Sequence, residues 1–342
     1  MSARSPRIGV LSFAHYHANF WSEVFAARGV LAGVWDEDSA RGLDAASRFA
    51  TAFEADLGTL LARCDAVAVC SETVRHAGLV DAAGERGCAV LCEKPLGVDA
   101  GDAERIARGV ASRGTWFMQS FPKRFDPATA RLREAVETGE LGHITLARVR
   151  HGHFYGLQPD FAQRWYVRRA LAGGGALLDE GVHAADLLRL LFGLPSSVVA
   201  ETSDAALGLE VEDLGIATFR WADGMLGEIV SSFTFAAADT SVELYGTRGT
   251  MLLSGVDLAS RDITASGFLR RFRLDAPERR WETLEVVPRF KIGEFHHQNA
   301  IAFVDALERG EPPPIPIGDG VAASRMIDAA YRAASSGVRV TL

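Results

Sequence analysis

The sequence predicts an α/β protein in which a doubly wound (Rossmann) parallel sheet is followed by an α+β domain with an open, mainly antiparallel sheet. Two patterns predict this fold class. Short apolar runs alternate with amphipathic stretches over about the first 120 residues, whereas apolar and polar residues alternate between turns in most of the remainder. The length of 342 residues also favours two domains, since one domain takes roughly 150 residues. We therefore expect domains at residues 1–123 and 124–342.

The first domain is expected to contain five strands that are buried on both faces, because its apolar runs are short and continuous. These strands lie at residues 7–11, 30–35, 66–70, 88–92 and 115–119. Between them, Ala, Leu, Glu and Arg recur at helical spacing in residues 39–49, 74–86 and 99–112. Strands that alternate with helices in this way favour parallel pairing through right-handed crossovers.

The second domain is expected to begin with a helix, a long strand and a second helix, at residues 127–138, 144–154 and about 176–192. Antiparallel strands are predicted where apolar and polar residues alternate between turns, at 198–206, 214–221, 226–235, 241–245 and 282–287. Two more helices, at about 292–308 and 320–334, and a short final strand complete the prediction.

The composition argues against a nucleic-acid binder, a membrane protein and a secreted disulfide scaffold. The net charge is −8, and scattered arginines offer no basic surface for DNA or RNA. No apolar run approaches the roughly 20 residues that span a bilayer, and the N-terminal residues lack the apolar stretch of a leader. The four cysteines form no CxxC pair, which suits a reducing compartment. We therefore expect a cytoplasmic protein.

The loop after the first strand is where a doubly wound sheet holds the pyrophosphate of a dinucleotide, at the N-terminus of the next helix. The glycine-rich fingerprint is absent, since residues 12–17 read Ser-Phe-Ala-His-Tyr-His. Small side chains at Ser12 and Ala14 still permit fairly close backbone approach, and N–H groups are expected to remain free at the start of the helix. Taken alone, the loop is equally compatible with a plain connection.

Asp36 ends the second predicted strand, where a carboxylate accepts hydrogen bonds from the adenosine ribose hydroxyls. A phosphate on that ribose would require a cation, whereas the stretch Asp36-Glu37-Asp38 is acidic. The preferred cofactor is therefore NAD, with NADP less favoured. The alternative for Asp36 is a helix N-cap or a solvated strand end.

The motif Glu93-Lys94-Pro95 follows the fourth strand, at the carboxyl edge of the predicted sheet. A lysine at this edge can stabilise negative charge on a substrate oxygen or pass a proton. A surface turn is the alternative.

The segment GGGALLDEGVHAAD, which starts at Gly173, is the strongest constellation in the chain. On one continuous helix, Asp179, His183 and Asp186 are spaced i, i+4 and i+7 and share a face. Carboxylates that flank a histidine raise its basicity and orient it as a general base. The alternative is a buried structural histidine.

Other histidines occur in pairs, namely His15 with His17, His151 with His153, and His296 with His297. Substrate contact is expected for His153, at the end of the first strand of the second domain, and surface or packing positions are expected for the last pair. A metal ion needs ligands of suitable geometry. Nothing in the spacing supplies that geometry, so no metal site is expected.

These motifs together resemble the Gfo/Idh/MocA oxidoreductase family, which includes glucose–fructose oxidoreductase and inositol dehydrogenase. The similarity covers nearly the whole chain and includes the Arg-Phe-Asp-Pro stretch at residues 124–127 and the turn at 137–142. The resemblance implies an N-terminal NAD(P)-binding domain and a C-terminal open sheet whose outer face often forms the oligomer contact. A homodimer or homotetramer is therefore expected.

By motif match, the resemblance implies that Lys94, Asp179 and His183 are catalytic. The residues expected at the cofactor are Ser12, Phe13, Ala14, His15, Asp36, Ser71, His76, Glu93, Lys94 and Arg124. Within that set, Glu93 and His76 match family positions on the nicotinamide side, and Phe13 and His15 are expected to cover the phosphates. The expected substrate wall comprises His153, Trp165, Tyr166 and Arg168.

The expected function is hydride transfer between the nicotinamide and a secondary alcohol of a sugar, polyol or related small molecule. His183, oriented by Asp179, removes the hydroxyl proton, and Lys94 stabilises the developing alkoxide. The two groups are expected to converge on one cleft between the domains. Two alternatives remain: a hydrolase or lyase that uses NAD for transient oxidation and yields no net NADH, and a non-catalytic dinucleotide-binding regulatory protein.

Overall fold

The computed structural model describes residues 5–236, 240–256, 267–288 and 293–342. It divides the chain into two compact units, of which the first comprises Met1–Pro122 with Phe295–Val321 and the second Lys123–Glu294 with Ala322–Leu342. The first crossing between the units lies next to the expected boundary. Phe295–Val321 differs from the expectation, because it returns to the first unit.

The returning segment is held by contacts with the last strand of the first unit. The N–H of Gln119 donates to the carbonyl of Ile315 at 2.8 Å, and Met118 pairs with Pro316 in an isolated antiparallel bridge. Ile317 packs against the hydrophobic core of the same unit. These contacts join segments far apart in the sequence, which an alternation of strands and helices does not reveal.

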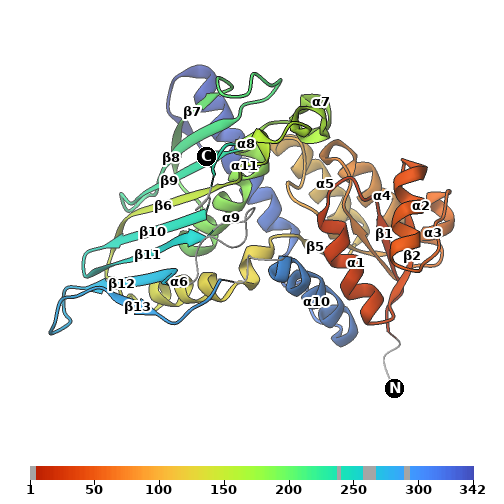
Figure 1. The fold of residues 1–342 in the computed structure, drawn as a ribbon, viewed down its shortest axis with the longest axis horizontal. Coiled ribbons are helices and arrows are strands. Elements are labelled where there is room, and N and C mark those ends of the chain that lie inside the picture. The colour runs from red at the N-terminus through yellow and green to blue at the C-terminus, as the bar shows by residue number, and fades with distance from the viewer. Residues whose placement is uncertain (1–4, 237–239, 257–266, 289–292) are drawn as a thin grey trace. The chain divides into compact units, whose positions relative to one another are not determined.

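In the described part of the chain, the first unit contains a five-stranded parallel sheet of order β2-β1-β3-β4-β5 (Figure 1). Its strands are β1 (Ile8–Leu11), β2 (Leu31–Trp35), β3 (Ala66–Val69), β4 (Ala89–Cys92) and β5 (Phe117–Gln119). Its helices are α1 (His17–Ala27), α2 (Ser39–Arg48), α3 (Leu57–Leu61), α4 (His76–Glu85), α5 (Ala100–Arg113), α10 (Glu294–Arg309) and the start of α11 (Ile317–Ser336). The predicted doubly wound parallel sheet is confirmed.

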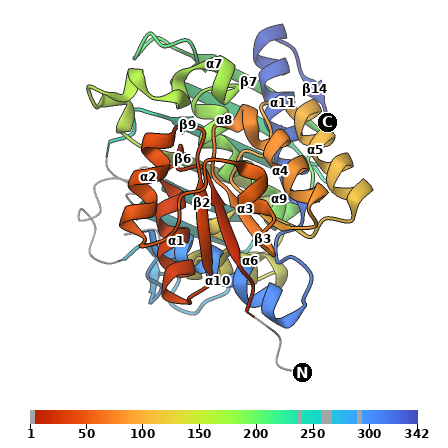
Figure 2. The ribbon, with the colours of Figure 1, turned by 90° about the vertical axis from the view of Figure 1, so that its right-hand side faces the viewer.

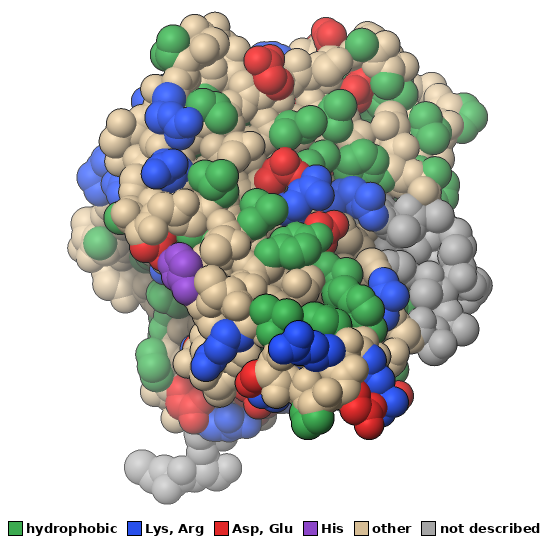
Figure 3. Space-filling model, turned by 90° about the vertical axis from the view of Figure 1, so that its left-hand side faces the viewer, with side chains coloured by type: hydrophobic (Ala, Val, Ile, Leu, Met, Phe, Trp, Pro, Cys, Tyr) green, Lys and Arg blue, Asp and Glu red, His purple; other side chains and the backbone are tan. Residues whose placement is uncertain are grey.

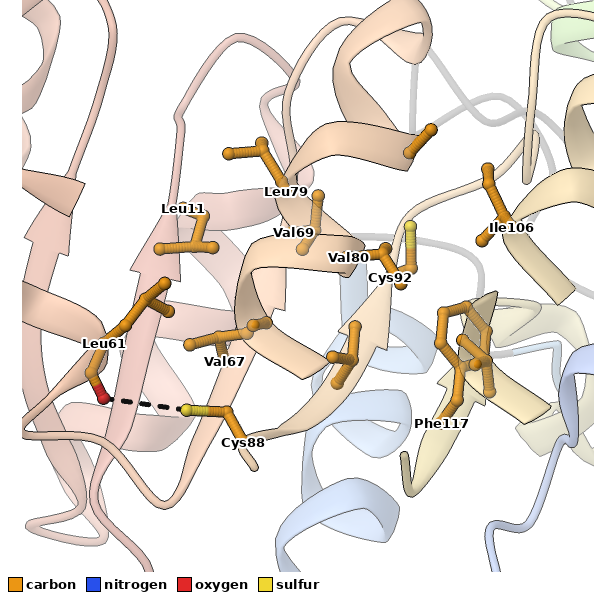
Figure 4. Packing of buried hydrophobic residues seen from close by; sticks show 14 of the residues in the cluster. Leu11, Leu61, Val67, Val69, Leu79, Val80, Cys88, Cys92, Ile106 and Phe117 are labelled. Carbon is orange, nitrogen blue, oxygen red and sulfur yellow. Dashed lines mark hydrogen bonds between the residues drawn. The ribbon is translucent and has the colours of Figure 1, made fainter. Parts of the chain in front are cut away.

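Helices cover both faces of this sheet, as a doubly wound fold requires. Figure 2 shows β2 and β3 with α1 on one side and α4 and α5 on the other. On one face, Leu61, Val80 and Ile106 from α3, α4 and α5 join strand residues in a buried apolar cluster (Figure 4). On the other, α1 and α10 meet through Phe25 and Phe303, whose ring centroids are 6.3 Å apart. Since helices cover the faces of the sheet, a ligand is expected beyond the carboxyl ends of its strands.

The second unit is built on a mixed sheet of order β13-β12-β11-β10-β6-β9-β8-β7-β14 among the described residues. Only the pair β6–β9 is parallel there, and the other pairs are antiparallel. The strands are β6 (Ile144–Gly152), β7 (Ser197–Ser203), β8 (Leu214–Arg220), β9 (Leu226–Ser232), β10 (Thr240–Gly246), β11 (Gly249–Val256), β12 (Leu269–Arg273), β13 (Glu282–Leu284) and β14 (Val340–Thr341). The predicted open, mainly antiparallel sheet is confirmed.

The helices of the second unit are α6 (Pro127–Glu137), α7 (Arg169–Ala172), α8 (Ala176–Asp179), α9 (Gly181–Phe192) and the remainder of α11. Helix α9 packs on β6 and β9, and α8 packs on β8 and β9. The prediction of one continuous helix at 176–192 is wrong, because helical hydrogen bonding is interrupted at Glu180. The N–H of His183 donates to the carbonyl of Glu180 (3.2 Å), three residues back rather than four.

The face of the second sheet away from α9 carries polar and apolar side chains together. Arg148 lies on β6 between Glu228 (2.8 Å) and Glu243 (3.5 Å), and Ile216 on β8 is 39% exposed. Figure 3 shows such mixing on one side of the molecule, where hydrophobic side chains lie among charged ones. No helix in the described residues is long and apolar enough to cross a membrane.

Candidate functional site

The loop between β1 and α1 is held in place by hydrogen bonds from its backbone N–H groups. Ser12 adopts a left-handed conformation, with φ of 75°. The loop N–H groups are hydrogen-bonded within the first unit: Phe13 to Asp36 Oδ2 (2.7 Å), Ala14 to Ser12 Oγ (3.1 Å) and His15 to the carbonyl of Cys70 (3.1 Å). At the start of α1, where free N–H groups were expected, the N–H of His17 donates to His15 Nδ1 (3.3 Å) and that of Ala18 to the carbonyl of His15 (3.2 Å). The expectation is therefore wrong for these two groups, since residues of the loop take the place that phosphate oxygens have at a helix N-terminus.

Asp36 follows β2 and is the acceptor that holds this loop. Its side chain is fully buried, and its Oδ1 accepts the N–H of Asp38 at 2.9 Å. Arg41 on α2 forms a bidentate pair with the same carboxylate, through Nε to Oδ2 (2.8 Å) and Nη2 to Oδ1 (2.7 Å). Arg41 was missed in the sequence because nothing but its position five residues after Asp36 indicates the pair.

The ends of β3 and β4 place Ser71, His76, Glu93 and Lys94 in the first unit. All four are buried. His76 Nδ1 lies 3.0 Å from the carbonyl of Pro95, and its Nε2 lies 3.3 Å from the carbonyl of Ser71. Burial lowers the pKa of His76, although these backbone contacts raise it in part. His76 therefore joins the loop after β3 to the Glu93-Lys94-Pro95 loop.

Glu93 also faces two histidines of the β1–α1 region. Its Oε1 lies 3.3 Å from His17 Nδ1, and its Oε2 accepts the hydroxyl of Ser120 at 3.2 Å. The rings of His15 and His17 are 4.0 Å apart, and His296 on α10 lies 3.6 Å from His17 between ring centroids. Burial lowers the pKa of His15 well below its usual value, and His17 lowers it further. His296 reaches this cluster only because α10 belongs to the first unit.

In the second unit, Asp179 ends α8 and His183 lies in the first turn of α9. Glu180 lies between them in the sequence. His151 Nδ1 is 2.7 Å from its Oε2, and His153 Nε2 is 3.7 Å from its Oε1. The rings of His151 and His183 are 4.8 Å apart. Donor atoms of His153, Asp179 and Glu180 lie within 4.8 Å of one another. Sequence reasoning missed Glu180, because its partner His151 lies on β6, 29 positions earlier in the chain.

Arg124 and Asp186 form an ion pair that the sequence analysis did not predict. Arg124 Nε donates to Asp186 Oδ2 at 2.9 Å, and Arg124 Nη2 also contacts Oδ1. Both side chains are largely buried. This pair joins the segment before α6 to α9, so Asp186 does not simply flank His183 as the helical spacing indicated, and Arg124 already has a carboxylate partner within the second unit.

The glycine run before α8 is held by Glu212 and Tyr331. The Glu212 carboxylate accepts the N–H groups of Gly175 (3.0 Å) and Leu177 (3.0 Å), and the Tyr331 hydroxyl donates to its Oε1 at 2.5 Å. A Cβ on Gly175 would lie 2.1 Å from the Glu212 carbonyl oxygen, and one on Gly174 would lie 2.3 Å from the Tyr331 hydroxyl. The glycines therefore leave room for the Glu212 carboxylate and the Tyr331 hydroxyl. This clamp, formed by Glu212 and Tyr331, fixes the start of α8, the helix that carries Asp179.

Electrostatics at this clamp follow from its burial. Burial raises the pKa of Glu212, although the Tyr331 hydroxyl and the backbone donors lower it in part. Burial and the Glu212 charge raise the pKa of Tyr331 well above its usual value. Neither residue carried a sequence signal, because the two lie 119 positions apart.

Trp165, Tyr166 and Arg168 lie in and just after the short helix Trp165–Val167, ahead of α7. The rings of Trp165 and Tyr166 are 4.3 Å apart, both side chains are partly exposed and Arg168 is exposed. They precede the glycine run in the same unit, and their role as a substrate wall with His153 stays a prediction.

Comparisons with known proteins agree with this architecture. Residues 8–121 match the model described as "Oxidoreductase family, NAD-binding Rossmann fold", and residues 129–252 match the "GFO/IDH/MocA C-terminal domain". The first unit is thus an NAD-binding Rossmann unit, and the predicted cofactor is confirmed.

Several named proteins are similar to the chain. It is 33% identical to 1,5-anhydro-D-fructose reductase of Ensifer adhaerens over 190 residues, which span 55% of this chain and 56% of that protein. It is 30% identical to D-xylose 1-dehydrogenase (NADP(+)) 2 of Haloferax volcanii, over 81% of this chain and 80% of that protein. The crystal structure of GenD2 from gentamicin A biosynthesis in complex with NAD is 27% identical, with a TM-score of 0.82 over 100% of this chain and 97% of that one.

Proposed function

Because the chain belongs to the Gfo/Idh/MocA oxidoreductase family, we propose that it transfers a hydride between NAD and a secondary alcohol of a sugar, polyol or related small molecule. The observation that carries this proposal is the junction of α8 and α9, where Asp179 ends α8 and His183 lies in the first turn of α9. Donor atoms of Asp179, Glu180 and His153 lie within 4.8 Å of one another there. Histidine beside carboxylates is suited to remove a hydroxyl proton, and an NAD-binding unit precedes it in the chain.

In this proposal His183 is the general base, and Asp179 orients it and stabilises its protonated form. Lys94, at the end of β4, stabilises negative charge on the substrate oxygen as the proton leaves. NAD, when bound, supplies the acceptor for the hydride. His153, Trp165, Tyr166 and Arg168 form the substrate wall, where aromatic faces suit the apolar faces of a sugar ring.

The residues of the first unit fit a dinucleotide in part. The sheet order reverses between β1 and β3, and ligands of open α/β sheets bind beyond the carboxyl ends of strands at such a point. The cofactor residues proposed there are Ser12, Phe13, Ala14, His15, Asp36, Ser71, His76, Glu93 and Lys94, with Arg124 from the second unit. The acidic stretch at Asp36 supports NAD over NADP, although Arg41 pairs with the Asp36 carboxylate. The bonded loop N–H groups leave less backbone for the pyrophosphate.

Calorimetric titration with NAD and NADP, followed by a panel of polyols and sugars read at the NADH absorbance, tests the proposal. We expect tighter binding of NAD and net NADH formation with at least one secondary alcohol. Conversion of a substrate without net NADH would instead indicate a hydrolase or lyase that uses transient oxidation. Dinucleotide binding with no turnover across the panel would indicate a regulatory protein.

We also propose a cytoplasmic homodimer or homotetramer. The open face of the second sheet, with Arg148 and the partly exposed Ile216, is the proposed subunit contact. Cys64 and Cys92 are free and buried, and burial raises the pKa of Cys64 to about 12, as suits thiols kept reduced. Light scattering coupled to size exclusion measures the assembly, and Ile216→Lys should shift it toward the monomer.

A further inference from the structure

His15, His17 and Glu93 form one buried cluster. His15 and Glu93 are also proposed to contact the cofactor, whereas His17 has no part in the proposed hydride transfer. His15 and His17 flank the start of α1, and Glu93 follows β4. Their exposed fractions are 3%, 4% and 1%. Buried ionisable groups are found mainly where they are paired or coordinate a metal, and three that meet at one point are candidates for metal coordination.

The geometry of these side chains approaches that of a metal-ligand set. One ligand atom from each of the three residues lies within 4.8 Å of the other two. His17 Nδ1 and Glu93 Oε1 are 3.3 Å apart. Two ligands of a tetrahedral zinc ion, with bonds of about 2.0–2.1 Å, are separated by about 3.3 Å. The His17–Glu93 edge therefore already has the required length, and the separations from His15, which are within 4.8 Å, would shorten when an ion binds.

The donor set also has the chemistry of a known class of site. Two imidazoles and one carboxylate are the protein ligands of several zinc enzymes, which keep a fourth position for water or substrate. Imidazole nitrogen favours zinc, copper, nickel and iron over magnesium or calcium, which prefer all-oxygen sets. His296, whose ring lies 3.6 Å from that of His17, closes one side of the cluster.

We propose that His15, His17 and Glu93 bind a transition-metal ion of the zinc type within the first unit. This goes beyond the proposed function and departs from our expectation from sequence, in which no metal site was foreseen. The ion would join the β1–α1 loop to the end of β4, two strands away in the sheet. Such a link gives a loop without glycines a fixed shape.

The second His-x-His pair is a weaker candidate. Its cluster, His153 with Asp179 and Glu180, offers one imidazole, and the Glu180 carboxylate already receives His151 Nδ1 at 2.7 Å. The two clusters therefore supply matched variants for one experiment.

The test is calorimetric titration of the chelator-treated full-length protein with Zn²⁺. We expect one ion per chain, with affinity at least about 100-fold weaker in His17→Ala and Glu93→Gln, since loss of one ligand exceeds the 10–100-fold effect of outer partners. His297→Ala, on the exposed neighbour of His296, and His153→Ala should keep the wild-type affinity. No binding, or binding lost in His153→Ala but kept in His17→Ala, overturns the proposal.

A measurement on the unmodified protein keeps the proposal testable if the buried variants do not fold. X-ray absorption of the zinc-loaded wild-type chain should show two imidazole ligands and oxygen at about 2.0–2.1 Å. Zn²⁺ should also raise the Tm of the chelator-treated protein, since an ion that binds only the folded state stabilises it. A spectrum with oxygen ligands alone, or with one imidazole, contradicts the assignment.

Discussion

Asp36 and Glu212 hold two loops of the molecule by the same kind of contact. Each carboxylate is buried, and each accepts backbone N–H groups from a segment that leads into a helix: Asp36 that of Phe13 (2.7 Å), and Glu212 that of Gly175 (3.0 Å). The first loop, residues 12–16 after β1, contains no glycine, although dinucleotide-binding folds usually have a glycine-rich loop at this place. The second loop consists of glycines although it lies in the other unit.

The difference lies in what each backbone touches. A Cβ on Gly175 would meet the Glu212 backbone at 2.1 Å, so only glycine allows that approach. Ser12 instead adopts a left-handed conformation, which is unfavourable by roughly 1–2 kcal/mol for a residue with Cβ. Its hydroxyl compensates by accepting the N–H of Ala14 (3.1 Å). Glycine is therefore required at position 175, where the Glu212 backbone approaches closely. The loop after β1 has no glycine and is held instead by the hydroxyl of Ser12 and the carboxylate of Asp36.

The largest effect is expected from removing the proposed catalytic group of each unit, Lys94 in the first and His183 in the second. His183→Ala and Lys94→Ala should each lower kcat by about 10²–10⁴-fold, the usual range for loss of a proton-transfer or charge-stabilising group. NADH affinity, measured by calorimetry, should stay within a few-fold in His183→Ala, because His183 is not among the proposed cofactor residues. His143→Ala, on an exposed histidine of the second unit, is the control and should keep its activity. An unchanged kcat in His183→Ala or Lys94→Ala would contradict these roles.

Removing the carboxylate that holds the glycine-free loop should have the next largest effect. Asp36→Ala leaves Arg41 and two backbone N–H groups without their acceptor, and we expect a loss of about 2–3 kcal/mol in the free energy of unfolding. Urea denaturation measures it. Asp44→Ala, at an exposed ion pair with Arg48, should change stability by less than about 0.5 kcal/mol. Equal effects from the two variants would show that Asp36 does not anchor the loop.

Filling the space in the glycine-rich loop should be harmful on a smaller scale. Gly175→Ala should destabilise the protein by about 1–3 kcal/mol, because the clash is with backbone atoms that cannot rotate away. Gly78→Ala, in α4 with nothing near its Cβ position, should instead stabilise by about 0.5–1 kcal/mol. The two thermal melts thus move in opposite directions. A Gly175→Ala variant as stable as wild type would remove the steric reason for the glycine run.

The smallest expected effect is a pH dependence at Glu212. Its pKa is raised in the folded state by burial, so the folded protein binds a proton more tightly than the unfolded chain. Stability from this group is present below its ordinary pKa of about 4.3 and is lost as the pH rises through the raised value. Glu212→Gln should therefore gain stability relative to wild type between pH 4 and neutrality, in urea melts at several pH values. A constant difference would show that the carboxylate is not penalised by burial.

Local patterns were sufficient for most of the fold. The strands of the first unit were predicted within two residues at each end, because continuous apolar runs such as Ala66–Val69 are buried on both faces. Strands β11 and β12 were not predicted. The sequence of β12, Leu-Arg-Arg-Phe-Arg, is dominated by arginines, and only pairing with β11 makes it a strand.

The candidate site was predicted where one segment carries it and missed where distant segments meet. Asp179 and His183 share one motif, whereas the Glu212–Tyr331 pair and the contact of His296 with His17 join remote parts of the chain. The interruption of the helix at Glu180 was also missed, since helical spacing does not indicate that the Glu180 carboxylate lies 2.7 Å from His151 Nδ1. Such contacts depend on tertiary packing, which overrides local preference.

Hydride transfer itself can be followed with an isotope. NADH with both C4 hydrogens replaced by deuterium would be supplied with the ketone corresponding to an alcohol found active in the panel, so that the label is transferred from either face of the ring. The account predicts one deuterium on the carbinol carbon of the product, detected by mass spectrometry and NMR, and its loss with His183→Ala. A product formed without deuterium, or an unchanged label after complete conversion, would contradict an oxidoreductase of this kind.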